Sequence, residues 1–415
     1  MKVTINQSIL NTAIESAMLA ISSKPITAIV GCIIIEANDE DNTLTIKSTN
    51  INFSIYQIID AEVSEKGQVA VSSQSFKKII ASLNGELYLS VEDSYLTISH
   101  ETGQCRLIIN ENIQEFPDIE TNLGECSTIS ISAKKLKTVL DSVLYAASRD
   151  ESRMIITGTN FYLDAINLEA AATDGHRMAR VQIPLDASRM GDAIVFTVPA
   201  NILAEINKIL STTSENIDCI IDIYDNLVAI TLPGIKIFSR LLDGEYPLIS
   251  KLIPKAFERE FTIERKSFID TLKRVLNIAD KNDKAVAISW NIKTRKAIIF
   301  TESDSIGDAY DEIPMKPQTN SAEDFSIGFN IDYLIQAVEN TTTDEIIVKC
   351  NEPTQPVLIC PVGSLLDQLS LVMPLQIKMS EPKLEPKANE KDDVAPKEKI
   401  SKPKKTRSLK QTVAA

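Results

Sequence analysis

One short stretch of the chain could perform acid–base chemistry. Residues 170–180 read AAATDGHRMAR, so Thr173, Asp174, His176 and Arg177 fall within five positions. The chain has only two histidines in all, and one of them lies here. A hydroxyl, a carboxylate and an imidazole this close together could form a general base or part of a nucleophilic triad.

The same stretch has a structural interpretation. Asp174-Gly175 is typical of a two-residue hairpin turn, and the flanking runs NLEAAAT and RMARVQI are typical of strands. The chain contains no G-x-S-x-G or H-E-x-x-H motif and no glycine-rich phosphate loop. We therefore predict a hairpin, with no catalytic residue, no metal and no cofactor. A hydrolase using His176 stays open as an alternative, and turnover abolished by His176→Ala would favour it.

Repeats indicate the elements that hold this hairpin. Three segments open alike, as a short strand followed by an amphipathic helix: VTINQSILNTAIESAM, ISISAKKLKTVLDSV and FTIERKSFIDTLKRVLNIA. Equating Ile5, Ile131 and Ile263 puts them 126 and 132 residues apart. This spacing is the size of a domain.

A second strand and helix follow in each repeat: VAVSSQSFKKIIASL, VFTVPANILAEINKIL and FSIGFNIDYLIQAVENT. They superpose at Val71, Val198 and Ile327, and β-rich runs come after every helix. We predict an α+β fold of three repeated domains, each made of two strand-helix-strands modules. The predicted domains cover residues 1–125, 126–255 and 256–378.

The composition changes after residue 378. Residues 379–415 contain four prolines, no glycine and no aromatic residue, with ten Lys or Arg against six Asp or Glu. Such a segment cannot bury enough apolar surface to offset its ordering entropy. We predict a disordered basic tail.

The whole chain is 44% hydrophobic and has a net charge of −14, which argues against general adhesion to nucleic acid but leaves room for a local basic patch. No apolar run approaches the ~20 residues of a membrane span, and MKVTINQSIL lacks the layout of a signal peptide. We predict a soluble cytoplasmic protein with no membrane partner. Six dispersed cysteines without a C-x-x-C pair should be reduced and mostly buried: Cys32, Cys105, Cys126, Cys219, Cys350 and Cys360.

Five motifs taken together resemble the bacterial DNA polymerase III β sliding clamp family: ATDGHRMA, SRLLDGEYPLISKLIP, EFPDIE, GFNIDYLIQAV and LVMPLQI. The resemblance covers residues 1–377 in order. It implies a non-catalytic processivity factor, a head-to-tail homodimeric ring around double-stranded DNA with helices inside and sheets outside. The implied partners are a clamp loader, the polymerase III catalytic subunit, and other polymerases and repair proteins.

The resemblance also implies a partner-peptide cleft between the second and third domains. One wall would use Ile156, Thr173, Gly175, His176, Arg177, Met178, Pro247, Lys251 and Leu252. The other would use Asn330, Tyr333, Thr354, Pro356, Val372, Met373, Pro374 and Leu375. In this interpretation Met178, Leu252 and Met373 bind apolar side chains, while His176 and Arg177 fix the peptide backbone. On apolar content alone, residues 371–375 could instead be a core strand.

Two further surfaces are implied. The DNA-facing residues would be Lys24, Lys77, Lys78, Lys134, Lys137, Arg149, Lys266 and Lys273, although the helix lysines could also be ordinary solvated charges. The dimer interface would bring Asn277 and Ile278 opposite an edge strand carrying Leu107 and Ile109. A protein-binding scaffold of the same fold that never encircles DNA is the alternative function, and a solution mass of one chain would favour it.

Overall fold

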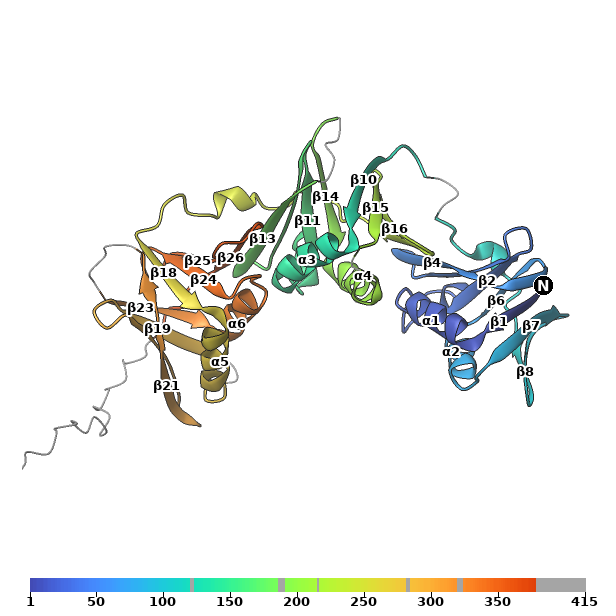
Figure 1. Ribbon diagram of the computed structural model, residues 1–415, viewed down its shortest axis with the longest axis horizontal. Helices are drawn as coiled ribbons and strands as arrows, with labels where there is room; N and C mark the ends of the chain where they lie inside the picture. The colour runs from blue at the N-terminus through green and yellow to red at the C-terminus, as the bar shows by residue number, and fades with distance from the viewer. Residues whose placement is uncertain (120–122, 186–190, 215, 281–283, 319–323, 378–415) are drawn as a thin grey trace, which may run out of the picture. The chain divides into compact units, whose positions relative to one another are not determined.

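The computed structural model of the protein describes residues 1–119, 123–185, 191–214, 216–280, 284–318 and 324–377 (Figure 1). The predicted tail, residues 379–415, lies outside the described residues. No described helix or strand spans either predicted domain boundary.

The first domain contains two helices and nine strands among the described residues. In order they are β1 (Lys2–Asn6), α1 (Gln7–Met18), η1 (Ile29–Gly31), β2 (Cys32–Asn38), β3 (Thr43–Thr49), β4 (Phe53–Asp60), β5 (Glu62–Glu65), β6 (Gly67–Ser72), α2 (Ser73–Ala81), β7 (Glu86–Glu92), β8 (Tyr95–His100), β9 (Gly103–Ile108) and η2 (Ile113–Glu115).

The second domain repeats this plan. Its elements are β10 (Ser127–Ser132), α3 (Ala133–Val143), η4 (Leu144–Ala146), η5 (Glu151–Thr157), β11 (Gly158–Leu163), β12 (Asn167–Thr173), β13 (Arg177–Pro184), β14 (Ile194–Pro199), α4 (Ala200–Thr212), β15 (Asp218–Ile223), β16 (Leu227–Leu232), β17 (Ile235–Arg240) and η6 (Ile249–Lys251).

The third domain repeats it again. Its elements are β18 (Arg259–Glu264), α5 (Arg265–Leu276), β19 (Ala285–Asn291), β20 (Lys296–Ser303), β21 (Gly307–Pro314), β22 (Lys316–Pro317), β23 (Phe325–Asn330), α6 (Ile331–Glu339), β24 (Glu345–Cys350), β25 (Val357–Pro361) and β26 (Asp367–Val372).

The predicted repeat is present as six strand-helix units, two in each domain. The first helix of each domain begins after Asn6, Ser132 or Glu264, whose side chains accept hydrogen bonds from backbone N–H groups of the first turn. These caps are 126 and 132 residues apart, as the sequence predicted. In every domain the two helices pack against each other and bury apolar faces on the sheets (Figure 1).

One predicted register is wrong. The second helix of each domain follows Ser72, Pro199 or Asn330, which makes Phe329, not Ile327, the equivalent of Val198. Strand side chains alternate with a period of two, so a shift of two residues leaves the apolar pattern unchanged. The sequence pattern could not distinguish these two alignments.

Two of the four sheets cross the domain boundaries. The eight-stranded sheet has the order β10-β15-β16-β17-β4-β3-β2-β6, so β17 of the second domain pairs with β4 of the first. The nine-stranded sheet has the order β14-β11-β12-β13-β26-β25-β24-β18-β22, so β13 pairs with β26 of the third domain. The other two sheets each lie within one domain. The first-domain sheet has the order β5-β1-β7-β8-β9, with β9 at one edge, and the third-domain sheet has the order β21-β20-β19-β23, with β21 at one edge.

The six cysteines are free thiols in different surroundings. Cys32, Cys219 and Cys350 are buried, and burial raises the pKa of Cys219 to about 11 and that of Cys350 to about 12. Cys360 is partly buried, and desolvation raises its pKa to about 11. Cys105 is also partly buried and Cys126 is exposed, so three of the six thiols are buried, fewer than the sequence predicted.

We expect a maleimide to modify one thiol of the native protein much faster than the others. The thiolate is the reactive form, and Cys126 alone is exposed, whereas the buried thiols are shielded and kept protonated. Stopped-flow labelling at pH 7.5 should show one fast phase that Cys126→Ser removes. All six thiols should react in denaturant, and a fast phase that survives in Cys126→Ser would contradict the assignment.

Candidate functional site

The DGH stretch forms a β-hairpin, as predicted, but its turn is centred one residue later. Thr173 pairs with Met178, and the chain reverses over residues 174–177 with Gly175 at φ +91°. Gly175 and His176 are therefore the central pair. The Asp174 carboxylate lies before the turn and accepts hydrogen bonds from the backbone N–H groups of His176 at 2.8 Å and Arg177 at 3.0 Å. This carboxylate stabilises the turn.

Arg177 attaches the hairpin to the third domain. Its guanidinium donates to the Asp174 carboxylate at 3.0 Å and to Gln336 on α6, and its side chain is only 10% exposed. It also lies 4.5 Å from the ring centre of Tyr333 and 5.4 Å from that of Tyr145. The sequence predicted that Arg177 would hold a peptide backbone. In this structure its Nε and one terminal nitrogen donate hydrogen bonds to Asp174 and Gln336 of the protein itself.

Met178 is also placed differently from the prediction. It pairs with Leu371 across β13 and β26, and the next strand brings Leu358 opposite Leu371. Tyr246 and Ile249 cover this face, which leaves Met178 only 1% exposed. Met178 is therefore buried in a small apolar cluster and does not line the cleft.

Val372 lies on the opposite face of the same sheet. Its register partner is Arg177, and it is fully buried in the third-domain core with Val357. Because neighbouring residues of a strand point to opposite faces, Met178 and Val372 cannot line one groove. The sequence-based prediction put both in the cleft because it could not resolve this alternation.

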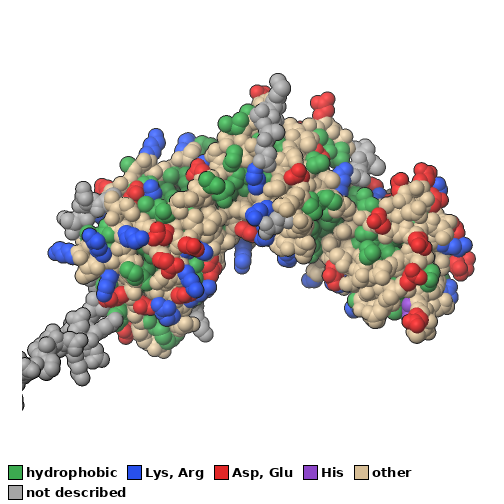
Figure 2. Space-filling model, viewed as in Figure 1, with side chains coloured by type: hydrophobic (Ala, Val, Ile, Leu, Met, Phe, Trp, Pro, Cys, Tyr) green, Lys and Arg blue, Asp and Glu red, His purple; other side chains and the backbone are tan. Residues whose placement is uncertain are grey.

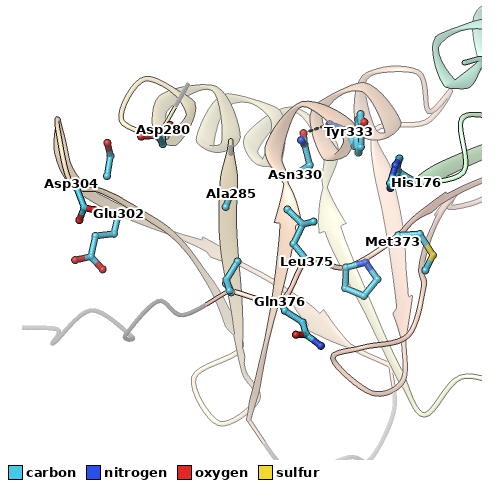
Figure 3. A pocket seen from close by; sticks show the side chains of 13 residues that line it. His176, Asp280, Ala285, Glu302, Asp304, Asn330, Tyr333, Met373, Leu375 and Gln376 are labelled. Atoms are coloured by element: carbon cyan, nitrogen blue, oxygen red, sulfur yellow. Dashed lines mark hydrogen bonds between the residues drawn. The ribbon is translucent and has the colours of Figure 1, made fainter. Parts of the chain in front are cut away.

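An open cleft of about 870 Å³ lies where the hairpin meets the third domain (Figure 3). Six predicted residues line it: His176, Asn330, Tyr333, Met373, Pro374 and Leu375. Seven residues that the sequence analysis missed also line it: Asp280, Ala285, Glu302, Ser303, Asp304, Gln376 and Ile377.

Backbone hydrogen bonds position the segment that lines the cleft. The Met373 N–H donates to the His176 carbonyl at 2.9 Å, and the Leu375 N–H donates to the Gly328 carbonyl at 2.8 Å. A β-carbon at Gly328 would lie 2.7 Å from the Leu375 oxygen, so this close approach requires glycine. Met373 and Leu375 remain 37% and 39% exposed, which leaves apolar surface for a ligand.

Asn330 and Tyr333 are placed by the start of α6. The Asn330 side chain accepts from the N–H groups of Asp332 and Tyr333 and so fixes the first turn of the helix. The Tyr333 ring then stacks near the His176 ring, with 6.3 Å between centroids. Figure 3 shows Tyr333 and His176 at the end of the cleft nearest the second domain, with Asn330 closer to its middle.

The remaining predicted cleft residues do not line this cleft. Ile156 and Thr173 are buried, while Gly175 is exposed at the tip of the hairpin. Pro247, Lys251 and Leu252 are exposed on the segment that covers the Met178 face, and Thr354 and Pro356 lie in the loop between β24 and β25.

The predicted DNA-facing residues are spread over helices and loops. Lys78, Lys134 and Lys266 are exposed on α2, α3 and α5, and Lys77 is half-buried on α2. Two others have acidic neighbours: Lys137 pairs with Asp141 at 2.8 Å and Lys273 with Glu339 at 2.6 Å. Lys24 and Arg149 are exposed outside the helices.

The predicted dimer residues lie on two separate elements. Leu107 and Ile109 pack onto the first-domain core, whereas Ile108 between them is 72% exposed and was missed by the sequence analysis. Asn277 is exposed at the end of α5, and Ile278 beside it is half-buried.

The described part of the chain has neither a metal-binding cluster nor a membrane-spanning helix. No cluster of three or more His, Cys, Asp or Glu side chains there could hold a metal ion. No helix there is both long and apolar enough to cross a membrane.

Comparison with known proteins assigns all three domains. Models for the N-terminal, central and C-terminal domains of the DNA polymerase III beta subunit match residues 1–120, 130–248 and 250–376. Beta sliding clamps are among the similar proteins. The chain is 28% identical to that of Synechocystis sp. over 91% of this chain and 100% of the relative, and 27% identical to that of Staphylococcus aureus over 91% and 99%.

Solved structures have the same fold. The DNA polymerase sliding clamp of Bacillus subtilis superposes with a TM-score of 0.84 at 24% identity, over 91% of this chain and 99% of that one. The DNA polymerase III beta subunit of Pseudomonas aeruginosa also gives 0.84, at 18% identity, over 91% and 100%. The predicted three-domain clamp fold is confirmed, and the chain belongs to the DNA polymerase III beta subunit family, the beta sliding clamps.

Proposed function

We propose that the protein is a non-catalytic sliding clamp of DNA replication, in which two chains close head to tail around duplex DNA. The observation that carries this proposal is that all three family domains occur in order in a chain whose first and last sheets each end in an open edge. An open edge strand readily pairs with another strand. Head-to-tail pairing of β9 with β21 of a second chain would satisfy both edges and close a ring.

The two edges are chemically suited to each other. On β9, the exposed Ile108 offers apolar surface and Arg106 a positive charge. On β21, Tyr310 is 44% exposed and Asp308 is exposed with a negative charge. Opposite charges favour the head-to-tail pairing over pairing of like edges. Asn277 and Ile278 are proposed to extend this contact.

Enclosure, not broad adhesion, would hold the DNA. The net charge of −14 opposes general binding to phosphates, and the face seen in Figure 2 carries positive and negative side chains intermixed. We place the predicted DNA-facing lysines, with Lys78, Lys134 and Lys266 as the most exposed on the helices, on the inner surface of the ring. Their role would be weak, sequence-independent contact that permits sliding.

The cleft beside His176 is the proposed attachment site for partners. Its exposed Met373 and Leu375 would receive apolar side chains of a linear peptide. The proposed partners are the clamp loader, the polymerase III catalytic subunit, and other polymerases and repair proteins. The alternative, a scaffold that binds such proteins without encircling DNA, predicts no topological link to DNA.

Retention on circular DNA tests the proposed function. The protein is loaded onto nicked circles with a clamp loader and ATP, the salt is raised to about 1 M, where the Debye length is ~3 Å, and bound protein is separated by gel filtration. A ring should stay on circles at this salt and leave once a restriction enzyme linearises them. Equal loss from circles and linear fragments on raising the salt would refute topological binding.

A further inference from the structure

The cleft has two chemically different ends. Tyr333, Met373, Pro374 and Leu375 supply apolar surface near His176. Asp280, Glu302 and Asp304 line the opposite end, which Figure 3 shows on the left. None of the thirteen described residues that line the cleft is a lysine or arginine.

The acidic end is built from segments that are distant in the sequence. Glu302 lies near the end of β20 and Asp304 at the tip of the β20–β21 hairpin, while Asp280 follows α5. Glu302 and Asp304 are both exposed, and neither forms an ion pair with another described residue. Because both side chains are exposed, a ligand can reach their carboxylates.

The floor of the cleft connects the two ends. Five consecutive residues, 373–377, line it, and the Leu375 N–H is bonded to β23 through Gly328. The floor is thus an extended segment, and a peptide lying along it would rise by about 3.3 Å per residue. An extended peptide that follows it would meet apolar side chains at one end and carboxylates a few residues away.

We propose that the cleft selects partner peptides that combine an apolar anchor with a nearby lysine or arginine. This inference rests on the proposed clamp function and specifies which partners the cleft accepts. The apolar anchor contacts Met373 and Leu375, and the cationic side chain lies against Glu302 and Asp304. Because these carboxylates are exposed, each ion pair is modest and screened by salt, so the two together should raise affinity by about 3- to 20-fold.

Three labelled peptides with one common anchor, Leu-Leu-Phe, test this selection. They differ only in the residues flanking the anchor on both sides, which are Lys-Lys, Gln-Gln or Glu-Glu. Fluorescence anisotropy with the full-length protein at 50 mM salt should rank the affinities Lys, then Gln, then Glu. The differences should shrink at 300 mM salt. Equal affinities of the Lys and Gln peptides would overturn the inference.

Two double variants test whether the cleft carboxylates cause the preference for lysine. Glu302→Gln with Asp304→Asn should reduce the affinity difference between the Lys and Gln peptides by at least threefold, although Asp280 stays in place. The matched control Glu40→Gln with Glu92→Gln makes the same change in net charge at exposed first-domain positions and should keep the ranking. Affinity differences of unchanged size in the cleft variant would overturn the inference. Circular dichroism and solution mass verify that each variant is folded.

The peptide measurements distinguish a failure of the charge preference from a failure of the proposed peptide site. If the Gln peptide binds and Met373→Ala with Leu375→Ala weakens it, the cleft is a peptide site, and only the ranking decides its charge preference. If no peptide binds, or if those two substitutions leave the peptide affinity unchanged, both the peptide site and its charge preference are refuted. Retention on circular DNA is a separate measurement, so it tests the proposed ring whichever of these results is obtained.

Discussion

Replacing Ile108 by aspartate is expected to separate the proposed ring into single chains. Ile108 is 72% exposed on the open strand β9, so the substitution should leave the fold of one chain intact. In the ring it would place an uncompensated charge in each of the two contacts, at a cost of about 3–5 kcal/mol per contact. Since ~1.4 kcal/mol is a factor of ten, the dissociation constant should rise at least a hundredfold.

Analytical ultracentrifugation and retention on circular DNA measure this effect. We expect the mass of one chain and loss from circles before linearisation. Ile58→Asp is the matched control, because Ile58 is a half-exposed isoleucine on β4, a strand with neighbours on both sides. An unchanged dimer in the Ile108→Asp variant would refute the proposed edge-to-edge contact.

Truncating Met373 and Leu375 together to alanine should weaken peptide and polymerase binding by about 1–4 kcal/mol, the range typical of anchor residues at a protein interface. Both side chains are exposed, so the loss should come from missing contacts with the ligand and not from unfolding. Isothermal titration with a polymerase-derived peptide measures the change in affinity. The backbone bonds from Met373 to His176 and from Leu375 to Gly328 should persist, since they involve no side-chain atoms.

Ile166→Ala provides the control for the cleft variant. Ile166 is 60% exposed but does not line the cleft, so its truncation removes a comparable apolar surface elsewhere. Peptide affinity should be unchanged in this control. Unaltered affinity in the Met373 and Leu375 double variant would show that partners attach at another surface.

Local signals in the sequence predicted the parts of this structure that depend on neighbouring residues. Strands followed by amphipathic helices recur with the spacing of a domain, and the caps Asn6, Ser132 and Glu264 lie where that spacing puts them. The hairpin around Gly175 was also predicted from its residues, because a glycine can adopt the positive φ that its turn requires.

Features that depend on distant residues could not be predicted in this way. Glu302 and Asp280 reach the cleft only because the third domain folds, and no local pattern connects them with His176. The burial of Met178 likewise depends on Tyr246 and Ile249, far away in the chain. The exposure of Ile108 depends on which side of β9 has a neighbouring strand, and that is a property of the sheet.

The strands that pair across domain boundaries also determine how the molecule responds to force. Six residue pairs join β13 to β26, and five join β17 to β4. Strands held side by side share a sliding load among many bonds at once, so these junctions resist shear more strongly than a flexible linker would. In the proposed ring, a force applied at one contact would therefore be carried through the whole chain before these junctions separate.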